Sequence, residues 1–178
     1  MRKFIILIAL AIAFASCVSK PQKQMMDILS QTVEKPTVTD FRIYKTTTLA
    51  DEVTQELSKY NCFLSWYKDW TIIFEDVDTQ KSLYYKEATE KTEKMIDYLE
   101  SIKTKHPDSY TQVSFTTYLM GYMCEGGHLE VAFGIFNNDG EMVAFRPTGT
   151  SEWTKIKNQN SIPEFDKYYS EYGSDLLL

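Results

Sequence analysis

The fold class of this chain is decided by residues 110–146, YTQVSFTTYLMGYMCEGGHLEVAFGIFNNDGEMVAFR. Apolar and polar side chains alternate along this stretch with period two, which is typical of half-buried β-strands. Two breaks divide it, Gly126-Gly127 and Asn137-Asn138-Asp139-Gly140. The stretch therefore predicts three antiparallel strands, Tyr110–Cys124, Leu129–Phe136 and Glu141–Arg146.

The first break predicts how the first two strands pair. A two-residue turn at Gly126-Gly127 places Tyr122 opposite Val131 and Met120 opposite Phe133. In this register four small residues share the reverse face of the sheet: Gly121, Ala132, Gly134 and Ala144. Small residues let another backbone or a flat group approach closely, so these four form a candidate binding groove. The alternative is that the aromatic C-terminal tail covers them.

The second break allows two registers. A three-residue loop, Asn138–Gly140, with Gly140 in a left-handed conformation, pairs Phe133 with Phe145. A two-residue turn instead places Arg146 opposite Phe133 and puts a charge into the apolar face. We therefore expect the three-residue loop.

Helical periodicity is clearest before these strands. From Thr79 to Lys105, apolar side chains recur at steps of three and four, and His106-Pro107 ends the pattern. Thr48 and Asp51 have the spacing of a capping pair, so a second helix is expected from about Leu49 to Trp66. The fold class predicted is α+β, with a long amphipathic helix packed on a three- or four-stranded antiparallel sheet. This order of elements resembles the topology of the cystatin and NTF2-like scaffolds.

Weaker patterns predict the remaining elements. Met25–Val33 has helical spacing, and Phe41–Lys45 alternates like a short strand. Trp70–Phe74 is short and apolar, and its periodicity does not distinguish strand from helix. A last helix is expected after Ser161-Ile162-Pro163, with Gly173 as its stop.

The N-terminus has the pattern of an export signal. Arg2 and Lys3 precede an unbroken apolar run of 12 residues, Phe4–Ala15, shorter than the roughly 18 that a bilayer-spanning helix needs. The residues Phe14-Ala15-Ser16-Cys17 resemble the lipobox of bacterial lipoprotein precursors. This resemblance implies that the signal peptide, residues 1–16, is removed and that Cys17 is acylated. The alternative is an ordinary secretory signal followed by a chance cysteine.

The mature chain divides into two parts on this interpretation. Residues 17–24 are the lipidated cysteine and a tether containing Pro21, and residues 25–178 form a single α+β domain. Acyl chains on Cys17 would hold the protein on a membrane, because each buried CH₂ contributes about 0.8 kcal/mol. Lipoproteins exported to the cell surface in some bacterial groups carry acids just after the cysteine, and Val18–Lys23 has none. We therefore expect a lipid-anchored envelope protein at the outer membrane, on its periplasmic side.

Two cysteines remain in the predicted domain, Cys62 and Cys124. An exported protein meets conditions that permit disulfides, so they form either a bridge or two buried free thiols. The chain has only two histidines, His106 and His128, and shows no paired spacing of zinc ligands. We expect neither a metal nor another cofactor.

Aromatic residues are frequent, at 14% of the chain. The side chains of Trp66, Tyr67, Trp70 and Trp153 are interpreted as core, and a stacking surface for carbohydrate or peptide is the alternative. With 25 acidic against 19 basic residues, the chain lacks the basic balance of a dedicated nucleic-acid binder. The sequence favours a non-catalytic module that binds an envelope protein or a small ligand, for instance as an inhibitor or immunity protein. A small envelope hydrolase using carboxylates and a structural subunit of an envelope assembly are the alternatives.

Overall fold

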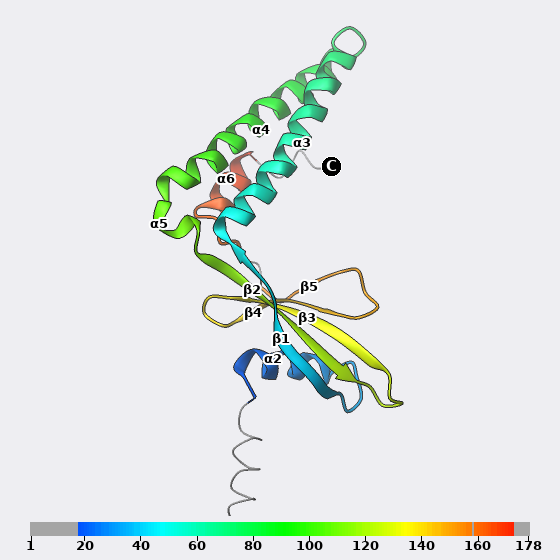
Figure 1. The fold of residues 1–178 in the computed structure, drawn as a ribbon. Helices are drawn as coiled ribbons and strands as arrows, with labels where there is room; N and C mark the ends of the chain where they lie inside the picture. The colour runs from blue at the N-terminus through cyan, green and yellow to red at the C-terminus, as the bar shows by residue number, and fades with distance from the viewer. Residues whose placement is uncertain (1–17, 158, 173–178) are drawn as a thin grey trace, which may run out of the picture. The chain divides into compact units, whose positions relative to one another are not determined.

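The computed structural model describes residues 18–157 and 159–172 (Figure 1). Cys17, the predicted signal peptide and Gly173 lie outside the described residues. In chain order the elements are α2 (Lys20–Leu29), β1 (Thr37–Thr48), α3 (Leu49–Phe74), α4 (Thr79–Lys105), α5 (Pro107–Tyr110), β2 (Val113–Met123), β3 (Leu129–Asn137), β4 (Met142–Pro147), β5 (Thr154–Lys155) and α6 (Phe165–Tyr172).

The α+β class is confirmed, and the sheet has five strands instead of three or four. Contacts between residues divide the described chain into two compact units. The sheet unit holds residues 18–46 and 115–157, and the helical unit holds residues 47–114 and 159–172. The expected single domain is therefore organised as two units, and the chain passes between them three times.

In the sheet unit, the strands follow one another in chain order, β1-β2-β3-β4-β5. Helix α2 covers one face, where Met25 and Leu29 are fully buried. They pack with sheet residues that include Met120, Phe136 and Phe145. This helix begins at Lys20, with the Ser19 hydroxyl accepting a hydrogen bond from the Gln22 amide. Most of the expected tether is thus helical.

The register predicted for the first hairpin is wrong by one residue. Gly121 lies opposite Val131, and Met120 lies opposite Ala132. The Cys124 amide donates to the His128 carbonyl at 3.0 Å, so Glu125 joins the two glycines in a three-residue loop. Both glycines have positive φ, 106° at Gly126 and 81° at Gly127, which lets the chain reverse over this longer loop.

The second hairpin combines the expected loop with an unexpected register. Gly140 has φ 69°, and the Asn137 amide donates to the Glu141 carbonyl at 3.0 Å, so the three-residue loop is confirmed. The register then shifts between Ile135 and Phe136. The predicted pairing of Phe133 with Phe145 is wrong, because Arg146 lies opposite Phe133.

This register suits both faces of the sheet. Phe145 lies opposite Gly134 and packs in the cluster under α2. The Arg146 guanidinium carbon lies 5.1 Å from the ring centroid of Phe133 and 4.8 Å from that of Trp153. These two cation–π contacts accommodate the charge of Arg146 on the face of the sheet opposite α2.

The predicted small-residue groove is not formed. Residues directly opposite each other in an antiparallel pair share a face. Ala132 therefore lies with Met120 under α2, as does Gly134, where a Cβ atom would come within 2.8 Å of Met25 Sδ. Gly121 and Ala144 belong to the opposite face of their strands. The longer loop of the first hairpin separates Gly121 from Ala132 and Gly134, and the register shift beside Ile135 separates Ala144 from them.

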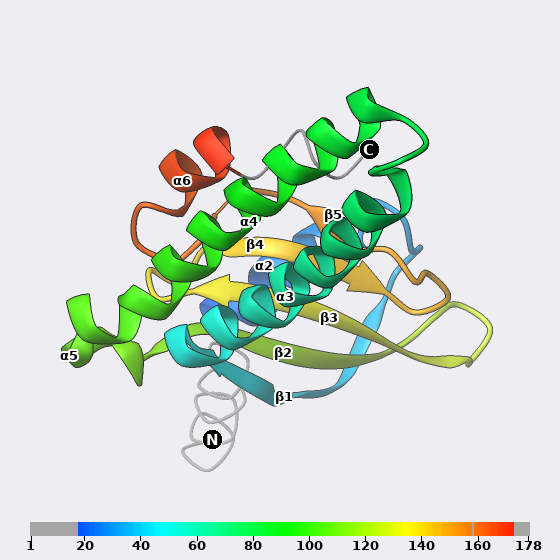
Figure 2. The same ribbon diagram turned by 90° about the horizontal axis from the view of Figure 1, so that it is seen from above.

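In the helical unit, α3 and α4 form a hairpin (Figure 2). The capping box predicted at Thr48 and Asp51 is confirmed, and Asp78 caps α4. The undecided segment Trp70–Phe74 forms the last turns of α3. The connection between the helices is short, which makes them antiparallel neighbours.

The apolar stripe of the long helix α4 lies in the core of this unit. Met95, Leu99 and Ile102 pack with Val53 of α3 and with Phe165 of α6. The Tyr98 and Tyr168 rings stack at a centroid distance of 3.8 Å, so the aromatic tail also packs here. Within the sheet unit, α2 is the helix that packs on the sheet. Within the helical unit, α3 extends for 26 residues and offers α4 an apolar partner of matching length.

Candidate functional site

The end of the α3–α4 hairpin carries a concentration of exposed apolar side chains. We define the apolar tip as Trp66, Trp70, Ile72, Ile73, Val77, Leu83 and Tyr84. The relative exposure is 69% for Ile72, 79% for Val77 and 61% for Leu83. A single exposed apolar residue is ordinary, but a group rimmed by polar residues is typical of an interaction site.

An aromatic stack supports the apolar tip from within the hairpin. The Trp70 and Phe74 rings of α3 and the Tyr85 ring of α4 lie nearly parallel, with centroids between 5.5 and 6.0 Å apart. The Tyr67 ring, which is buried, continues the stack at 6.2 Å from Tyr85. Because aromatic contacts join the two helices here, the stack holds the exposed side chains on a well-packed base.

Hydrogen bonds close the turn between the helices. The Asp78 amide donates to the Phe74 carbonyl at 3.0 Å, and the Val77 amide donates to the same carbonyl at 3.2 Å. The Asp78 carboxylate accepts from the Lys81 amide at 3.1 Å and so caps α4. The backbone around the exposed Val77 is therefore held by several bonds, and its side chain projects from an ordered turn.

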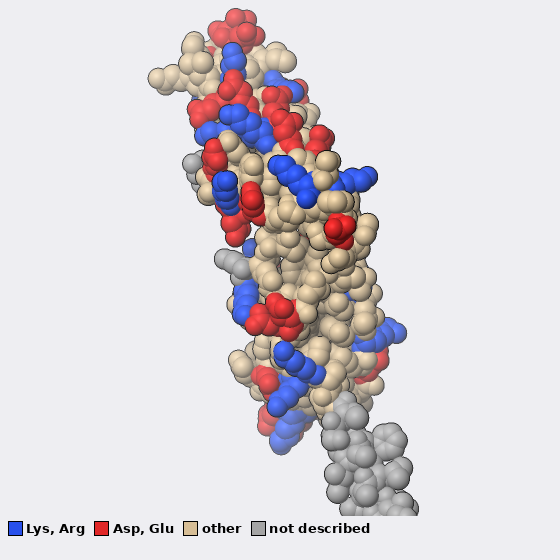
Figure 3. Space-filling model, turned by 90° about the vertical axis from the view of Figure 1, so that its left-hand side faces the viewer, with Lys and Arg blue, Asp and Glu red and all other residues tan. Residues whose placement is uncertain are grey.

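Acidic side chains lie beside this apolar surface at the end of the hairpin. Asp69 is exposed near the C-terminal end of α3, and Glu75 and Asp76 are exposed in the turn that follows. Figure 3 shows acidic side chains, in red, beside uncharged ones at the end of the helical unit that carries the turn. Lys81 is engaged locally, with its ammonium 5.0 Å from the Phe74 ring centroid and 3.8 Å from the Asp78 carboxylate. The apolar tip is thus bordered by negative charge.

The sequence interpretation of the tryptophans as core is wrong at two positions. Trp66 is 56% exposed and Trp70 is 43% exposed, whereas Tyr67 is buried and Trp153 is half-buried. The pattern did hold a signal for this surface. Trp66, Trp70, Ile73 and Val77 follow each other at steps of four, three and four, which is the spacing of an apolar stripe along α3 that continues into the turn after it.

The sequence left open either a bridge between the two cysteines or two buried free thiols, and both cysteines are free in the structure. Cys62 is exposed on α3, which also contradicts the alternative of two buried thiols, and Cys124 is half-buried at the end of β2. Partial burial and the nearby Glu130 carboxylate raise the pKa of the Cys124 thiol. A raised pKa disfavours the reactive thiolate, so Cys124 lacks the environment of a nucleophile.

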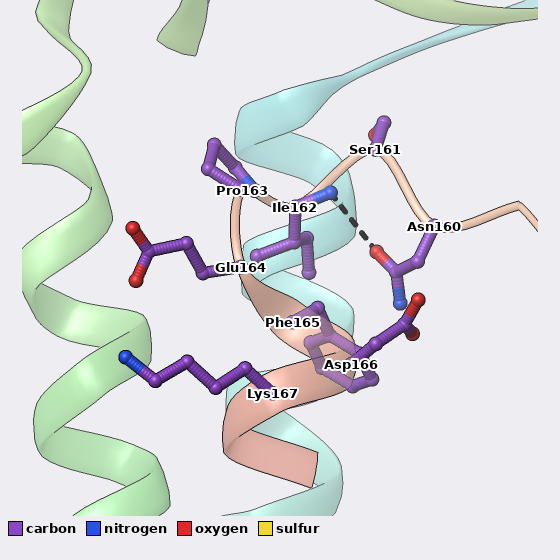
Figure 4. Close-up of a pocket in the computed structure, with 8 residues that line it drawn as sticks. All are labelled: Asn160, Ser161, Ile162, Pro163, Glu164, Phe165, Asp166 and Lys167. Atoms are coloured by element: carbon purple, nitrogen blue, oxygen red, sulfur yellow. Dashed lines mark hydrogen bonds between the residues drawn. The ribbon is translucent and has the colours of Figure 1, made fainter. Parts of the chain in front are cut away.

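A pocket of about 230 Å³ lies where the chain enters α6. Its lining is one continuous segment, residues 160–167 (Figure 4). The Asn160 side chain accepts from the Ile162 amide at 2.9 Å, and the charged ends of Glu164 and Lys167 point away from Asn160. Active sites usually gather ionisable groups from several elements into one cleft. This pocket is lined by a single segment of the chain, so it lacks that arrangement.

Glu52 of α3 is a partly buried carboxyl group in contact with that segment. The Ser161 hydroxyl donates to its carboxylate. Burial raises the pKa of Glu52, and hydrogen bonds from Ser161 and Ser114 oppose this effect. The group therefore joins the start of the α6 segment to α3, which is a structural role.

Two further findings concern chemistry and anchoring. Within residues 18–157 and 159–172, no group of three or more His, Cys, Asp and Glu side chains is arranged to hold a metal ion. In the same ranges, none of the helices combines the length with the apolar character that a bilayer-spanning segment requires.

Comparison with known proteins identifies no relative of this chain. No family model matches it, and neither a curated protein nor a solved structure shows significant similarity to it.

Proposed function

We propose that this chain is a lipid-anchored protein of the bacterial cell envelope that binds a protein partner without catalysing a reaction. The observation that carries the proposal is the apolar tip of the α3–α4 hairpin. It presents exposed Trp, Ile, Val and Leu side chains on an ordered turn. Large apolar and aromatic side chains on a pre-organised base are the kind of group that dominates binding energy in protein interfaces.

The charges around the apolar tip specify the chemistry of the partner. Glu75 and Asp76 are exposed next to Val77 in the turn. A protein with an apolar pocket rimmed by Lys and Arg would cover the apolar side chains and pair with these carboxylates. An anionic lipid surface would repel them. The apolar tip therefore favours a basic-rimmed protein pocket over a membrane.

The proposed anchor is the acyl modification of Cys17. It rests on the lipobox-like residues Phe14-Ala15-Ser16-Cys17 and on the apolar run before them. An anchored binding module stays close to other envelope proteins, which raises its effective concentration toward a membrane-bound partner. The outer membrane, on its periplasmic side, is the location that we propose.

Site-specific photo-cross-linking in cells tests the binding surface. A photoreactive amino acid replaces Ile72 in the full-length chain, and the matched control places it at Glu100, an exposed position of α4 away from the apolar tip. We expect a discrete adduct with one envelope protein from position 72 and none from position 100. Replacing Glu75 and Asp76 by Lys in the same chain should abolish the adduct.

Three outcomes would contradict this use of the apolar tip. They are adducts with lipid alone, adducts with a second copy of this chain alone, and an adduct that survives the charge reversal at Glu75 and Asp76.

The anchor is tested separately by feeding cells a labelled fatty acid. Label should be incorporated into the wild-type chain and into Cys62→Ala, and it should be absent from Cys17→Ala.

A further inference from the structure

Strand β1 is an open edge of the sheet. It lies first in the order β1-β2-β3-β4-β5, and no strand pairs with its outer side in the described part of the chain. Figure 2 shows β1 along one margin of the sheet. The strand runs for 12 residues without Gly or Pro, TVTDFRIYKTTT, whereas the opposite edge strand β5 has two residues. A long regular edge carries unpaired backbone donors and acceptors that a second strand can use.

The middle of β1 is exposed and carries both signs of charge. Ile43 and Tyr44 are 58% and 62% exposed. The Arg42 Nε atom lies 3.4 Å from the Asp40 carboxylate, and both side chains are largely in solvent. Residues two apart on a strand share a face, so the two opposite charges lie side by side on one face.

Symmetry limits how β1 can pair with β1 of a second copy. A continuous antiparallel sheet of two identical chains has a two-fold axis perpendicular to the sheet, and opposite residues share a face. The axis must therefore pass between one residue of β1 and the same residue in β1 of the other copy. We call this an axis at that residue. An axis at Asp40, Arg42 or Lys45 puts like charges opposite each other, which is destabilising.

One axis position produces charge complementarity. Within residues 40–46, only an axis at Phe41 places opposite charges directly across the new strand pair. It sets Asp40 of each copy opposite Arg42 of the other. Together with the ion pair inside each strand, the four charges alternate in sign around a closed square.

We propose that two copies of this chain associate through β1, antiparallel and centred on Phe41, so that the sheets of the two copies form one continuous sheet. Backbone hydrogen bonds along the edge supply the attraction, and the Asp40–Arg42 pairs select the register. This interface involves the sheet unit and is independent of the apolar tip.

Charge steering between two tagged copies tests the interface. Full-length chains with different affinity tags are co-expressed, and co-purification is measured for each combination, with Cys62 and Cys124 replaced by Ser. Arg42→Asp alone makes both cross-strand contacts pairs of acids, and Asp40→Arg alone makes both contacts pairs of arginines, so neither variant should pair with itself. The two variants together restore opposite charges at both contacts. We expect their mixed pair to form about tenfold or more strongly than either self-pair.

This design separates an interface from a stability effect. Each variant has like charges at positions 40 and 42 of its own β1, both in its self-pair and in the mixed pair. The ion pair inside the strand is therefore absent in all of them, and stronger association of the mixed pair must come from contacts between the two chains. Lys45→Asp is the matched control, because Lys45 lies opposite Thr37 in this register and should leave self-association unchanged. Circular dichroism of each variant checks that it is folded.

The proposal is overturned by any of three results. They are absence of wild-type self-association, self-association that persists in Arg42→Asp, and a mixed pair no stronger than the self-pairs. Loss of association in Lys45→Asp equal to that in Arg42→Asp would likewise exclude the register centred on Phe41.

Discussion

The Sδ atom of Met25 lies 2.8 Å from the position that a Cβ atom would occupy on Gly134. Met25 belongs to α2, and Gly134 lies in the middle of β3. The absence of a side chain at Gly134 is therefore what lets the helix lie on the sheet at this distance. Both Met25 and the neighbouring Ala132 are fully buried at this contact.

Gly134→Ala should lower the free energy of unfolding by about 1–3 kcal/mol, because the added methyl group overpacks the contact with Met25. The sign of this change is informative, since Ala is otherwise favoured over Gly in a strand. Chemical denaturation of the full-length chain measures the free energy of unfolding. Adding Met25→Ala to Gly134→Ala should cost less than the sum of the two single changes. Strict additivity would show that the two residues do not constrain each other.

Gly140→Val should also destabilise the protein, by about 1–2 kcal/mol, because a β-branched residue is strained at positive φ. The observed φ of Gly140 is 69°. Gly140→Asn is the matched control, since Asn adopts this conformation more readily and should lose less. Both are compared by thermal unfolding. Equal losses for Val and Asn would indicate that backbone conformation is not the cause.

Tyr60→Phe should raise the free energy of unfolding by about 1–3 kcal/mol, because the Tyr60 hydroxyl is buried without a hydrogen-bond partner among the described residues. Removing it eliminates a desolvation cost and keeps the ring contact with Phe63. Tyr98→Phe is the control with the opposite sign, since the Tyr98 hydroxyl donates to the Pro163 carbonyl. A Tyr60→Phe variant that is less stable than wild type would contradict the assignment.

The carboxyl group of Glu52 should make stability fall as pH rises. Burial raises its pKa in the folded state, so between the unfolded and folded pKa values the folded protein holds more protons than the unfolded chain. The contribution is present below the ordinary carboxyl pKa and is lost as pH increases through the folded value. Relative to Glu52→Gln, wild type should therefore be more stable at about pH 4 than at about pH 7, as measured by urea unfolding at each pH.

Glu141 should show the opposite dependence. Hydrogen bonds from Lys157 and Asn137 lower its pKa, so its contribution is present above the ordinary carboxyl pKa and is lost as pH falls. Wild type should lose stability relative to Glu141→Gln on acidification, and added salt should reduce the difference, because the Lys157–Glu141 pair is exposed. If Glu52 and Glu141 showed the same sign of pH dependence, one of the two interpretations would be wrong.

Local chemistry explains which parts of the fold were predictable. Thr48 and Asp51 cap α3, because each side chain bonds the backbone amide of the other, only three residues away. Gly140 determines the loop of the second hairpin in the same local way, through its φ. The α+β class follows from the change of period after Pro107. These features depend on neighbours in the sequence alone.

The candidate site was less predictable. Apolar and aromatic residues such as Trp70 are buried in most proteins, so pattern alone assigned the end of α3 to the core. Whether Trp66 and Trp70 find a cover depends on what packs around the end of the hairpin, which periodicity does not contain. The same applies to the pairing of Cys62 with Cys124, since it requires the distance between two elements.

Taken by itself, the sequence determined the long helix α4, the capped start of α3, the three main strands, the loop at Gly140 and the mixed class of the fold. Only the tertiary structure decided the register of the strands and the partner of each apolar face. A register shift of one residue moves every side chain of a strand to the opposite face of the sheet. Here the loop at Glu125 and the irregularity beside Ile135 place Gly134 under α2 and Arg146 between two aromatic rings. Those choices arise from close packing between elements distant in the chain, where a contact such as Met25 with Gly134 outweighs local preference.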